Sequence, residues 1–427
     1  MNAIVRGAAP PRRTTVVVIG AGQAGLSSSY YLSRFGVDHV VLERGRVGNS
    51  WRTERWDSLS LLTPNWQSSL PGMDYVGDDP DGFMQLDEVI GLVTDYAQNC
   101  GAPVEEYTCV TGVKPWGEGY RVCTGRGDWV CASVIVASGA FNKAQVPGLA
   151  SALPAKVAQF TTQTYRNPGQ LGTGGVLVVG AAASGVQIAE EVQRSGRQVT
   201  LAVGEHVRMP RRYRGRDIQY WMHACGLLDE DWRKVDDLSR VRRLPSAQLL
   251  GSPDNRDVDI NALRAQGVEV AGRLAGIDKG QLQFSGGLAN VTRLADLKLN
   301  RLLDTIDRWI DEQPGDAGLA ARPATTALPE KPRLNVAVDE IETVIWATGY
   351  RPDYSWLELP ILDRRGRPEH RGGVTALPGV YLMGLPYMRR RQSSFIAGAG
   401  EDARDICHHL LNYLGRPIDW YWKEISA

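Results

Sequence analysis

Two segments of the chain show the same order of hydrophobic and polar positions. Each has a short β-branched apolar run, then a glycine-rich turn, then a helical pattern, and they span residues 15–32 and 176–194. The apolar runs, Val16–Ile19 and residues 176–179, are hydrophobic at every position, which is typical of parallel strands buried on both faces. We therefore predict an α/β fold with two Rossmann-like units, each of the type that binds a dinucleotide.

Glycine and proline interrupt the chain between and after these units. Residues 104–136 carry glycines at short intervals and predict a small antiparallel sheet that covers the first unit. Residues 146–148 and the Pro- and Ala-rich residues 314–332 predict linkers on either side of the second unit. Before the second linker, helical spacing predicts a core-facing helix, with a partner-binding helix as the alternative. The apolar positions of this helix are Leu299, Leu302, Leu303, Ile306 and Ile310.

Charge balance and cysteine content argue against several classes of partner. The 427 residues include 48 basic and 48 acidic side chains, which favours neither nucleic acid nor an anionic membrane surface. The six cysteines include no CxxC pair, which argues against a redox dithiol or a zinc site and indicates a reducing compartment. Residues 1–13 lack the apolar stretch of a signal peptide, and no later stretch resembles a spanning helix. We expect a cytoplasmic protein without a metal site and with neither nucleic acid nor membrane as partner.

Residues 20–25 form a GxGxxG turn between the strand and the helix of the first segment. Gly20 permits the tight bend, Gly22 permits close approach of a pyrophosphate, and Gly25 permits packing of the helix on the strand. Glu43 closes the next apolar strand, where a carboxylate can accept hydrogen bonds from a ribose. This order predicts a dinucleotide site and leaves open whether FAD or NAD is bound.

The residues after Glu43 resemble those of flavin-containing and Baeyer–Villiger monooxygenases, which are class B flavoprotein monooxygenases. Residues 48–52, GNSWR, resemble the segment that lies over the isoalloxazine ring in that family. Residues 56–67, WDSLSLLTPNWQ, resemble a bacterial branch, and residues 134–139 and 346–350 resemble the two ATG strands at which the chain crosses between domains. The resemblance implies that the first unit binds FAD and the second binds NADPH or NADH.

The resemblance also implies a FAD domain built from both ends of the chain around an inserted NAD(P)H domain. The FAD domain is expected at residues 1–150 and 335–427, and the inserted domain at residues 151–334. Asp402 begins a late helix whose N-terminus would face the flavin, with an ordinary Ser or Asp cap as the alternative. The residues expected to bind FAD are Gly20, Gly22, Gln23, Ala24, Gly25, Glu43, Arg44, Ser50, Trp51, Leu62, Thr63, Ala137, Gly139 and Asp402.

Residues 180–185, GAAASG, stand where the family has its GxGxSG motif for NAD(P)H, but Ala182 replaces the middle glycine. We expect binding to be retained, with weaker affinity or a changed pose. Glu205 would favour NADH, and the arginines of residues 208–216 would favour NADPH, with a solvated basic loop as the alternative. The residues expected to bind NAD(P)H are Gly180, Ala182, Ser184, Gly185, Arg211, Arg212, Ala347, Thr348 and Gly349.

The residues that serve oxygen chemistry in this family are incomplete in the chain. Thr161 stands where the identifying motif has histidine, and Leu62 stands where many members have an active-site asparagine. Thr63 and Asn65 are the neighbouring candidates for a catalytic role, with turn chemistry beside Pro64 as the alternative.

The resemblance implies a monooxygenase that uses O2 and oxygenates a nitrogen, a sulfur or a carbonyl carbon of a small molecule through a flavin C4a-hydroperoxide. A FAD-dependent dehydrogenase or oxidase that does not stabilise this hydroperoxide is one alternative. A flavin redox sensor without turnover is another. A homodimer is compatible with the sequence.

Overall fold

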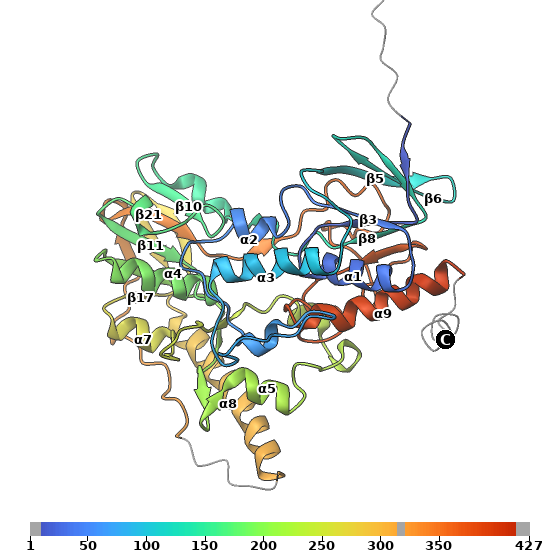
Figure 1. Cartoon of the computed structure of the whole chain (residues 1–427). Coiled ribbons are helices and arrows are strands. Elements are labelled where there is room, and N and C mark those ends of the chain that lie inside the picture. Colours follow the sequence, from blue (N-terminus) through green and yellow to red (C-terminus); the bar gives the residue numbers. More distant parts are fainter. Residues whose placement is uncertain (1–9, 314–320, 416–427) are drawn as a thin grey trace, which may run out of the picture.

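The computed structural model describes residues 10–313 and 321–415. These residues form two α/β lobes, each built around a parallel sheet of five strands (Figure 1). The two sheets confirm the α/β fold with two Rossmann-like units.

The first lobe contains the sheet β23-β8-β2-β3-β4, in which all neighbours are parallel. Its strands are β2 (Val16–Ile19), β3 (His39–Leu42), β4 (Val104–Glu105), β8 (Ser133–Val136) and β23 (Val380–Leu382). Helix α1 (Gln23–Arg34) packs against β2 and β3, and both α3 (Leu86–Asn99) and α9 (Gly398–Tyr413) pack against α1. Because the sheet is covered on both faces, every residue of β2, β3 and β8 is buried.

A second, smaller sheet of the first lobe has the order β1-β7-β6-β5. Its strands are β1 (Arg12–Arg13), β5 (Val110–Trp116), β6 (Gly119–Thr124) and β7 (Trp129–Cys131). Strands β5, β6 and β7 are antiparallel, which confirms the small sheet expected within residues 104–136. The two ends of that range differ from the expectation, because β4 and β8 pair in the large parallel sheet.

The second lobe contains the parallel sheet β10-β21-β11-β12-β17. Its strands are β10 (Ala158–Thr161), β11 (Gly175–Val179), β12 (Val199–Ala202), β17 (Glu269–Ala271) and β21 (Ile341–Trp346). Helix α4 (Ala183–Arg194) packs against β11 and β12. Strand β21 lies beyond residue 334, so the boundary expected between residues 334 and 335 stands too early in the chain. The chain leaves the second sheet after Trp346, because β21 pairs with β10 and β11.

The chain crosses between the lobes in a short antiparallel ribbon. Strand β9 (Lys143–Ala144) follows the first lobe's β8, and β22 (Tyr350–Arg351) follows the second lobe's β21. The backbone nitrogen of Gln145 donates to the backbone oxygen of Gly349 at 2.9 Å. The two ATG-like strands are therefore followed by crossings that lie side by side.

Helix α8 (Leu288–Asp311) extends away from the second sheet beside α5 (Ile218–Ala224) (Figure 1). Leu299, Leu303, Ile306 and Ile310 are buried in a cluster with Trp221 and Ile218, and Leu302 is partly buried against it. This packing confirms the core-facing helix. The remaining helices and strands are α2 (Asn49–Thr53), η1 (Asn65–Ser68), η2 (Gly148–Ala152), η3 (Pro168–Gln170), β13 (Val207–Arg208), β14 (Arg212–Tyr213), β15 (Arg216–Asp217), η4 (Trp232–Lys234), α6 (Leu238–Val241), β16 (Ala247–Gln248), α7 (Ile260–Ala265), β18 (Leu274–Asp278), β19 (Gln281–Phe284), β20 (Asn335–Ala337) and η5 (Val338–Glu340).

Of the two expected linkers, residues 146–148 run from the ribbon into η2. Residues 321–332 contain no helix or strand, and residues 314–320 lie outside the described residues.

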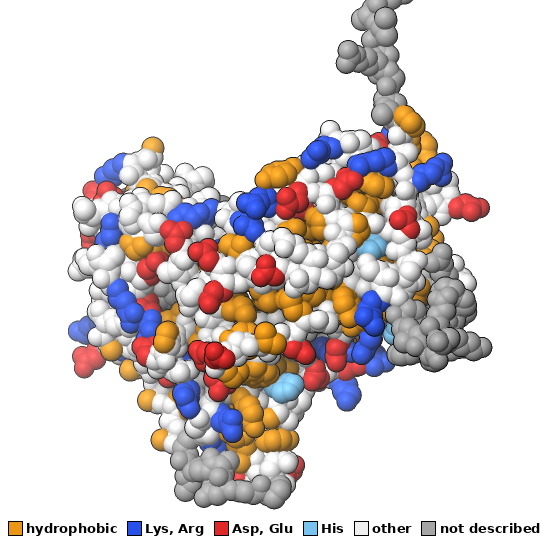
Figure 2. Space-filling view, in the orientation of Figure 1, with side chains coloured by type: hydrophobic (Ala, Val, Ile, Leu, Met, Phe, Trp, Pro, Cys, Tyr) orange, Lys and Arg blue, Asp and Glu red, His pale blue; other side chains and the backbone are white. Residues whose placement is uncertain are grey.

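Acidic and basic side chains are interspersed over the face shown in Figure 2. Within the described ranges, no helix is long and apolar enough to cross a membrane.

Candidate functional site

The first glycine-rich turn is closed by contacts that only glycine allows. Gly20 has φ +107, and a Cβ there would lie 2.6 Å from the backbone oxygen of Ala137, which follows β8. A Cβ at Gly25 would overlap the backbone oxygen of Gly20 and touch the Cβ of Ala137. Both glycines are thus needed for the turn, the helix and the end of β8 to meet. Gly139, two residues after Ala137, has φ +81 and open space beside it.

Gly22 lies where the turn faces open space. It is the N-cap of α1, it makes no side-chain cap, and a Cβ built on it would meet no atom within 4 Å. The first backbone N–H groups of α1, in Gln23, Ala24 and Gly25, therefore have no capping side chain at the positive end of the helix dipole. Such an uncapped helix start beside an open glycine fits a pyrophosphate.

Glu43 joins this turn to the end of β3. Its side chain is buried, with Oε2 accepting a hydrogen bond from the nitrogen of Ala21 at 2.8 Å and Oε1 accepting one from Gly45 at 3.1 Å. A carboxylate has further lone pairs, so Glu43 can also accept from a ribose hydroxyl. The neighbouring Arg44 forms an ion pair with Glu54. The buried acid and the open cradle together fit the ribose and the phosphates of a dinucleotide.

The second turn repeats this geometry. Gly180 has φ +112, and a Cβ there would overlap the backbone oxygen of Ala347, the residue after β21. A Cβ at Gly185 would overlap the oxygen of Gly180 and lie 3.4 Å from the Cβ of Ala347, as at Gly25 and Ala137. Ala347 thus has the same place in the second lobe that Ala137 has in the first. Gly349 has φ +88, and the Thr348 hydroxyl donates to the oxygen of Gln145 in the crossing ribbon.

Ala182 adopts the same backbone conformation as Gly22. Its angles are φ −79 and ψ −179, against φ −90 and ψ −177 for Gly22. This extended conformation suits any residue, so alanine introduces no backbone strain. Like Gly22, Ala182 is an N-cap that makes no side-chain cap, and Ser184 lies in the first turn of α4. At the N-cap position, the two turns therefore differ by one methyl group.

The two turns also differ at the residue that follows the second strand. Gly20 donates to the oxygen of Leu42 at 2.8 Å, and Gly180 donates to the oxygen of Ala202 at 2.9 Å, so Val203 occupies the place of Glu43. Val203 is fully buried and offers no ribose ligand. In the first turn Glu43 bonds to the backbone of Ala21. In the second turn Gln248 bonds to the backbone of the equivalent residue, since its Nε2 donates to the oxygen of Ala181 at 2.8 Å.

Gln248 was missed by sequence reasoning, because β16 is a two-residue strand with no pattern of its own. Its side chain is 1% exposed, and its Oε1 has no hydrogen-bond partner within the described structure. A buried acceptor without a donor is rare in native proteins, so Oε1 of Gln248 is an unsatisfied polar atom beside the second turn.

The arginines expected at the nicotinamide are held by the protein itself. Arg211 is 1% exposed, and its guanidinium contacts Asp217 at 2.6 Å and the backbone oxygen of Leu62 at 2.8 Å. Arg212 is exposed and bonds to the oxygen of Gly215. Arg208 is paired with Asp259 and Asp296. The structure thus brings Arg211 of the second lobe together with Leu62 of the first, although the sequence suggested separate cofactor roles for them.

The segment from Leu62 to Ser68 holds several unsatisfied polar atoms. Leu62 and Thr63 are partly exposed, whereas Asn65 is buried and its Nδ2 donates to the oxygen of Asp79 at 2.8 Å. This bond leaves only Oδ1 of Asn65 without a partner. Gln67 Oε1 and Ser68 Oγ are buried and also have no hydrogen-bond partner in the described part of the chain. Sequence reasoning missed Gln67 and Ser68, although they directly follow the TPNW residues.

Trp51 lies between the cores of the two lobes. It is part of α2 with Ser50 and packs against the hydrophobic clusters of both lobes. The Arg55 guanidinium lies 5.4 Å from the ring centroid of Trp51. Trp51 therefore lies at the boundary between the lobes, and its place over a flavin, expected from the GNSWR resemblance, stays a prediction.

Helix α9 starts close to the Leu62–Ser68 segment. A Cβ at Gly400, in the first turn of α9, would lie 2.9 Å from Pro71. Asp402 is fully buried and its Oδ1 accepts from Arg390 at 2.7 Å. Burial raises the pKa of Asp402 to about 6, against the opposing hydrogen bonds from Ser393 and Arg390. The N-cap of this described helix is Ala397, which makes no side-chain cap, so the alternative of an ordinary Ser or Asp cap is wrong.

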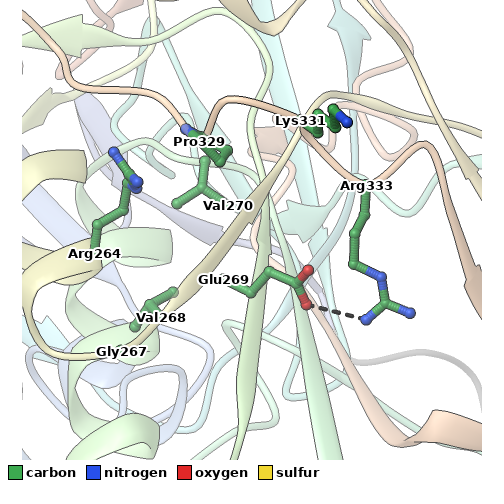
Figure 3. A pocket seen from close by; sticks show the side chains of 8 residues that line it. All are labelled: Arg264, Gly267, Val268, Glu269, Val270, Pro329, Lys331 and Arg333. Carbon is green, nitrogen blue, oxygen red and sulfur yellow. Dashed lines mark hydrogen bonds and ion pairs between the residues drawn. The ribbon is translucent and has the colours of Figure 1, made fainter.

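The pocket in Figure 3 lies away from both turns. It measures about 220 Å³ and lies at the edge strand β17, where Arg264, Lys331 and Arg333 surround Glu269. None of the residues expected from the sequence lines this pocket. In the part of the chain that the structure describes, no group of three or more His, Cys, Asp or Glu side chains could hold a metal ion.

Comparison with known proteins gives three further findings. A family model described as pyridine nucleotide-disulphide oxidoreductase matches residues 17–225. The uncharacterized oxidoreductase CzcO-like of Geobacillus kaustophilus is 34% identical over 401 residues, which cover 93% of this chain and 98% of the relative. The rice indole-3-pyruvate monooxygenase YUCCA1 is 26% identical over 294 residues, 65% of this chain and 70% of that protein.

A solved structure shows the same fold over nearly the whole chain. The flavin-containing monooxygenase from Stenotrophomonas maltophilia superposes with a TM-score of 0.66 at 22% identity, covering 94% of this chain and 99% of that one.

Proposed function

Because this chain belongs to the family of CzcO-like oxidoreductases, we propose that it is a FAD-dependent monooxygenase that takes its electrons from NADPH or NADH. One observation carries the proposal: two glycine-rich turns of matching geometry lie in two lobes that meet at the Leu62–Ser68 segment. Two dinucleotide sites in contact with one another fit hydride transfer between a nicotinamide and a flavin.

We assign FAD to the first lobe and NAD(P)H to the second. The segment after Glu43 supports the first assignment. It carries Trp51, which lies at the boundary between the lobes, as expected for a residue over a flavin. Val203 supports NADPH in the second lobe, since no acid at that position repels a 2′-phosphate. Glu205, the nearest acid in sequence, is paired with Lys298 at 2.9 Å.

The protein's part is to position the cofactors and to exclude water from the place where they meet. A bound flavin would supply hydride acceptance and oxygen activation. The N–H groups at the starts of α1 and α4 would hold the phosphates, and Glu43 would orient the ribose. Leu62 and Trp51 would keep the boundary apolar, while the free acceptors of Asn65 and Gln67 would take hydrogen bonds from cofactor or substrate.

The names of two similar proteins support oxygenation over simple oxidation. They are the rice indole-3-pyruvate monooxygenase and the Stenotrophomonas flavin-containing monooxygenase. One observation favours the second candidate, a dehydrogenase or oxidase: Leu62 offers no side-chain donor at the segment nearest the expected flavin. The substrates we propose are a small organic molecule and O2, and the six free cysteines support a cytoplasmic setting.

Anaerobic mixing of the FAD-loaded full chain with NADPH or NADH tests the cofactor assignment. We expect the flavin absorbance band to bleach, faster with NADPH than with NADH. A flavin that neither nucleotide reduces would contradict the assignment and leave a redox sensor as the function.

The fate of the electrons is tested in air with a sulfide, a tertiary amine and a ketone as trial substrates. A monooxygenase consumes NADPH in excess of the hydrogen peroxide that it releases, because oxygen enters the substrate. Equal amounts of peroxide and NADPH with every trial substrate would support the oxidase instead.

A further inference from the structure

Arg242 is a guanidinium without an acidic partner at the contact between the lobes. It follows α6 in the second lobe, and its Nε donates at 3.3 Å to the backbone oxygen of Tyr387 in the first lobe. Its Nη2 is buried and has no hydrogen-bond partner among residues 10–313 and 321–415. Burying part of a guanidinium without an anion is costly, so this arrangement calls for a ligand that supplies one.

Other arginines near this contact are neutralised. Arg211 is paired with Asp217, Arg390 with Asp402, and Arg391 with Glu230. Burial lowers the pKa of Arg242, and no carboxylate of the described residues opposes the effect. Arg242 therefore differs from its neighbours in having an unsatisfied positive charge.

His370 provides a second hydrogen-bond donor on a segment that packs next to Tyr387, the hydrogen-bond acceptor of Arg242, since a Cβ at Gly373 would lie 3.0 Å from Sδ of Met388. Its Nδ1 accepts a hydrogen bond from the nitrogen of Gly373 at 3.1 Å, so the proton of the neutral ring lies on Nε2. Burial, and then the charge of Arg242, lower the pKa of His370 to about 4. The ring is thus neutral near pH 7 and adds a donor without adding charge.

The segment that carries Arg242 touches the main parts of the proposed active site in turn. Leu228 accepts a hydrogen bond from Gln392, which lies just before α9. Further along, Gln248 contacts Ala181 of the second turn, and a Cβ at Gly251 would meet the oxygen of Leu61. The loop that contains Tyr387 begins beside α1, since a Cβ at Gly384 would lie 2.9 Å from that of Ala24. The segment that carries Arg242, and the loop of Tyr387 to which Arg242 donates, therefore contact structures that serve both proposed cofactors.

We propose that Arg242 and His370 bind the carboxylate of an organic acid that is the substrate. This assignment rests on the proposed function and names the substrate class for it. One guanidinium charge and one neutral donor match the single charge of a carboxylate. A phosphate dianion would need a second free cation, and the nearby Arg389 is already paired with Asp405.

Calorimetric titration of the FAD-loaded full chain tests this site. The probes are benzoate and phenylacetate, each compared with its neutral amide, benzamide or phenylacetamide. We expect each acid to bind about tenfold tighter than its amide, because a charge-assisted hydrogen bond is lost in the amide. Arg242→Gln should abolish this difference, and His370→Gln, which keeps a donor, should retain more of it than His370→Phe.

Arg243→Gln is the matched control, because Arg243 is the next residue and is exposed, and its side chain donates to the backbone oxygen of Ser239. It should bind both acids like the wild type. Equal binding of acids and amides by the wild type, or unchanged acid binding by Arg242→Gln, would overturn the proposal. So would an Arg242→Gln effect confined to the KM for NADPH and not for NADH, which would assign the site to the 2′-phosphate. A failure of the proposed function itself would be seen in a separate measurement: neither NADPH nor NADH would reduce the flavin of the wild-type protein.

Discussion

Gly22 and Ala182 occupy equivalent places with nearly equal backbone angles. Exchanging the residue type at each position therefore tests the effect of the same methyl group in both turns. Gly22→Ala adds a methyl group without backbone strain at the place where a pyrophosphate would approach the first turn. We expect the fold to be kept and the affinity for FAD to fall about tenfold, equal to about 1.4 kcal/mol. Fluorescence titration of the apoprotein with FAD measures this change.

Ala182→Gly is the reciprocal substitution. It should tighten NADPH binding and leave FAD binding unchanged, and the helix should be kept because glycine is a better N-cap than alanine. If Ala182→Gly tightened FAD binding instead, our assignment of cofactors to lobes would be reversed.

The roles of Gly20 and Gly25 could be predicted from the sequence, because they follow from the steric limits of one local turn. The role of Gln248 could not. It depends on a long-range contact with Ala181, which no local pattern encodes. The same holds for Val203, whose equivalence to Glu43 follows from the strand register.

Asp402 makes stability depend on pH in a defined direction. Burial raises its pKa from 3.8 to about 6 in the folded protein. The folded state then holds this proton more tightly than the unfolded chain, so the stabilisation is complete below about pH 4 and is lost as the pH rises through about 6. Asp402→Asn has no such proton, and its stability relative to the wild type should rise by about 1–3 kcal/mol between about pH 4 and 7. Urea unfolding of both proteins over this range measures the difference, and a constant difference would contradict the raised pKa.

At the scale of whole elements, the two ATG-like strands could be predicted from the sequence, but the sheet to which each belongs could not. Residues 134–139 and 346–350 have similar patterns, and both strands were expected at domain crossings. Pairing partners decide that β8 lies in the first sheet and β21 in the second, and partners are a tertiary property. For this reason the expected boundary at residue 334 was wrong, although both strands were recognised.

The contact between β14–β15 and the Leu62–Ser68 segment depends on one buried ion pair. Arg211→Met should destabilise the protein by about 3 kcal/mol or more, because it leaves Asp217 buried without its partner. Arg211→Met combined with Asp217→Asn should recover part of this loss, since no unpaired charge remains. Urea unfolding measures both variants.

Arg212→Met is the control for this pair, because Arg212 is the neighbouring exposed residue. Its effect should stay within about 0.5 kcal/mol. Equal losses for Arg211→Met and Arg212→Met would show that the buried pair contributes nothing to the contact.

For the whole molecule, turnover requires the two lobes to hold two cofactors at one place. The lobes are joined by the crossing ribbon, by Arg211 on Leu62 and by the loop at Gly251. Only two residues separate Gln248, at the second turn, from Gly251, at Leu61. This loop therefore sets the distance between the second turn, where we propose the nicotinamide cofactor, and the segment that we propose lies beside the flavin.

Gly251→Ala tests whether that distance governs hydride transfer. The added Cβ would overlap the oxygen of Leu61 and lie 2.6 Å from the Cβ of Phe83, so the lobes must move apart. Both glycine turns remain intact, and we expect unchanged affinities for FAD and NADPH. Flavin reduction by NADPH, followed by stopped-flow absorbance, should slow by about tenfold or more, because misplacement by about 1 Å can cost about a hundredfold in rate.

Gly286→Ala is the control, since a Cβ there would meet no atom within 4 Å. It should reduce its flavin at the wild-type rate. A Gly251→Ala enzyme that is reduced equally fast would show that the lobes rearrange during turnover, and that the closed contact between Gly251 and Leu61 is not the geometry in which hydride moves.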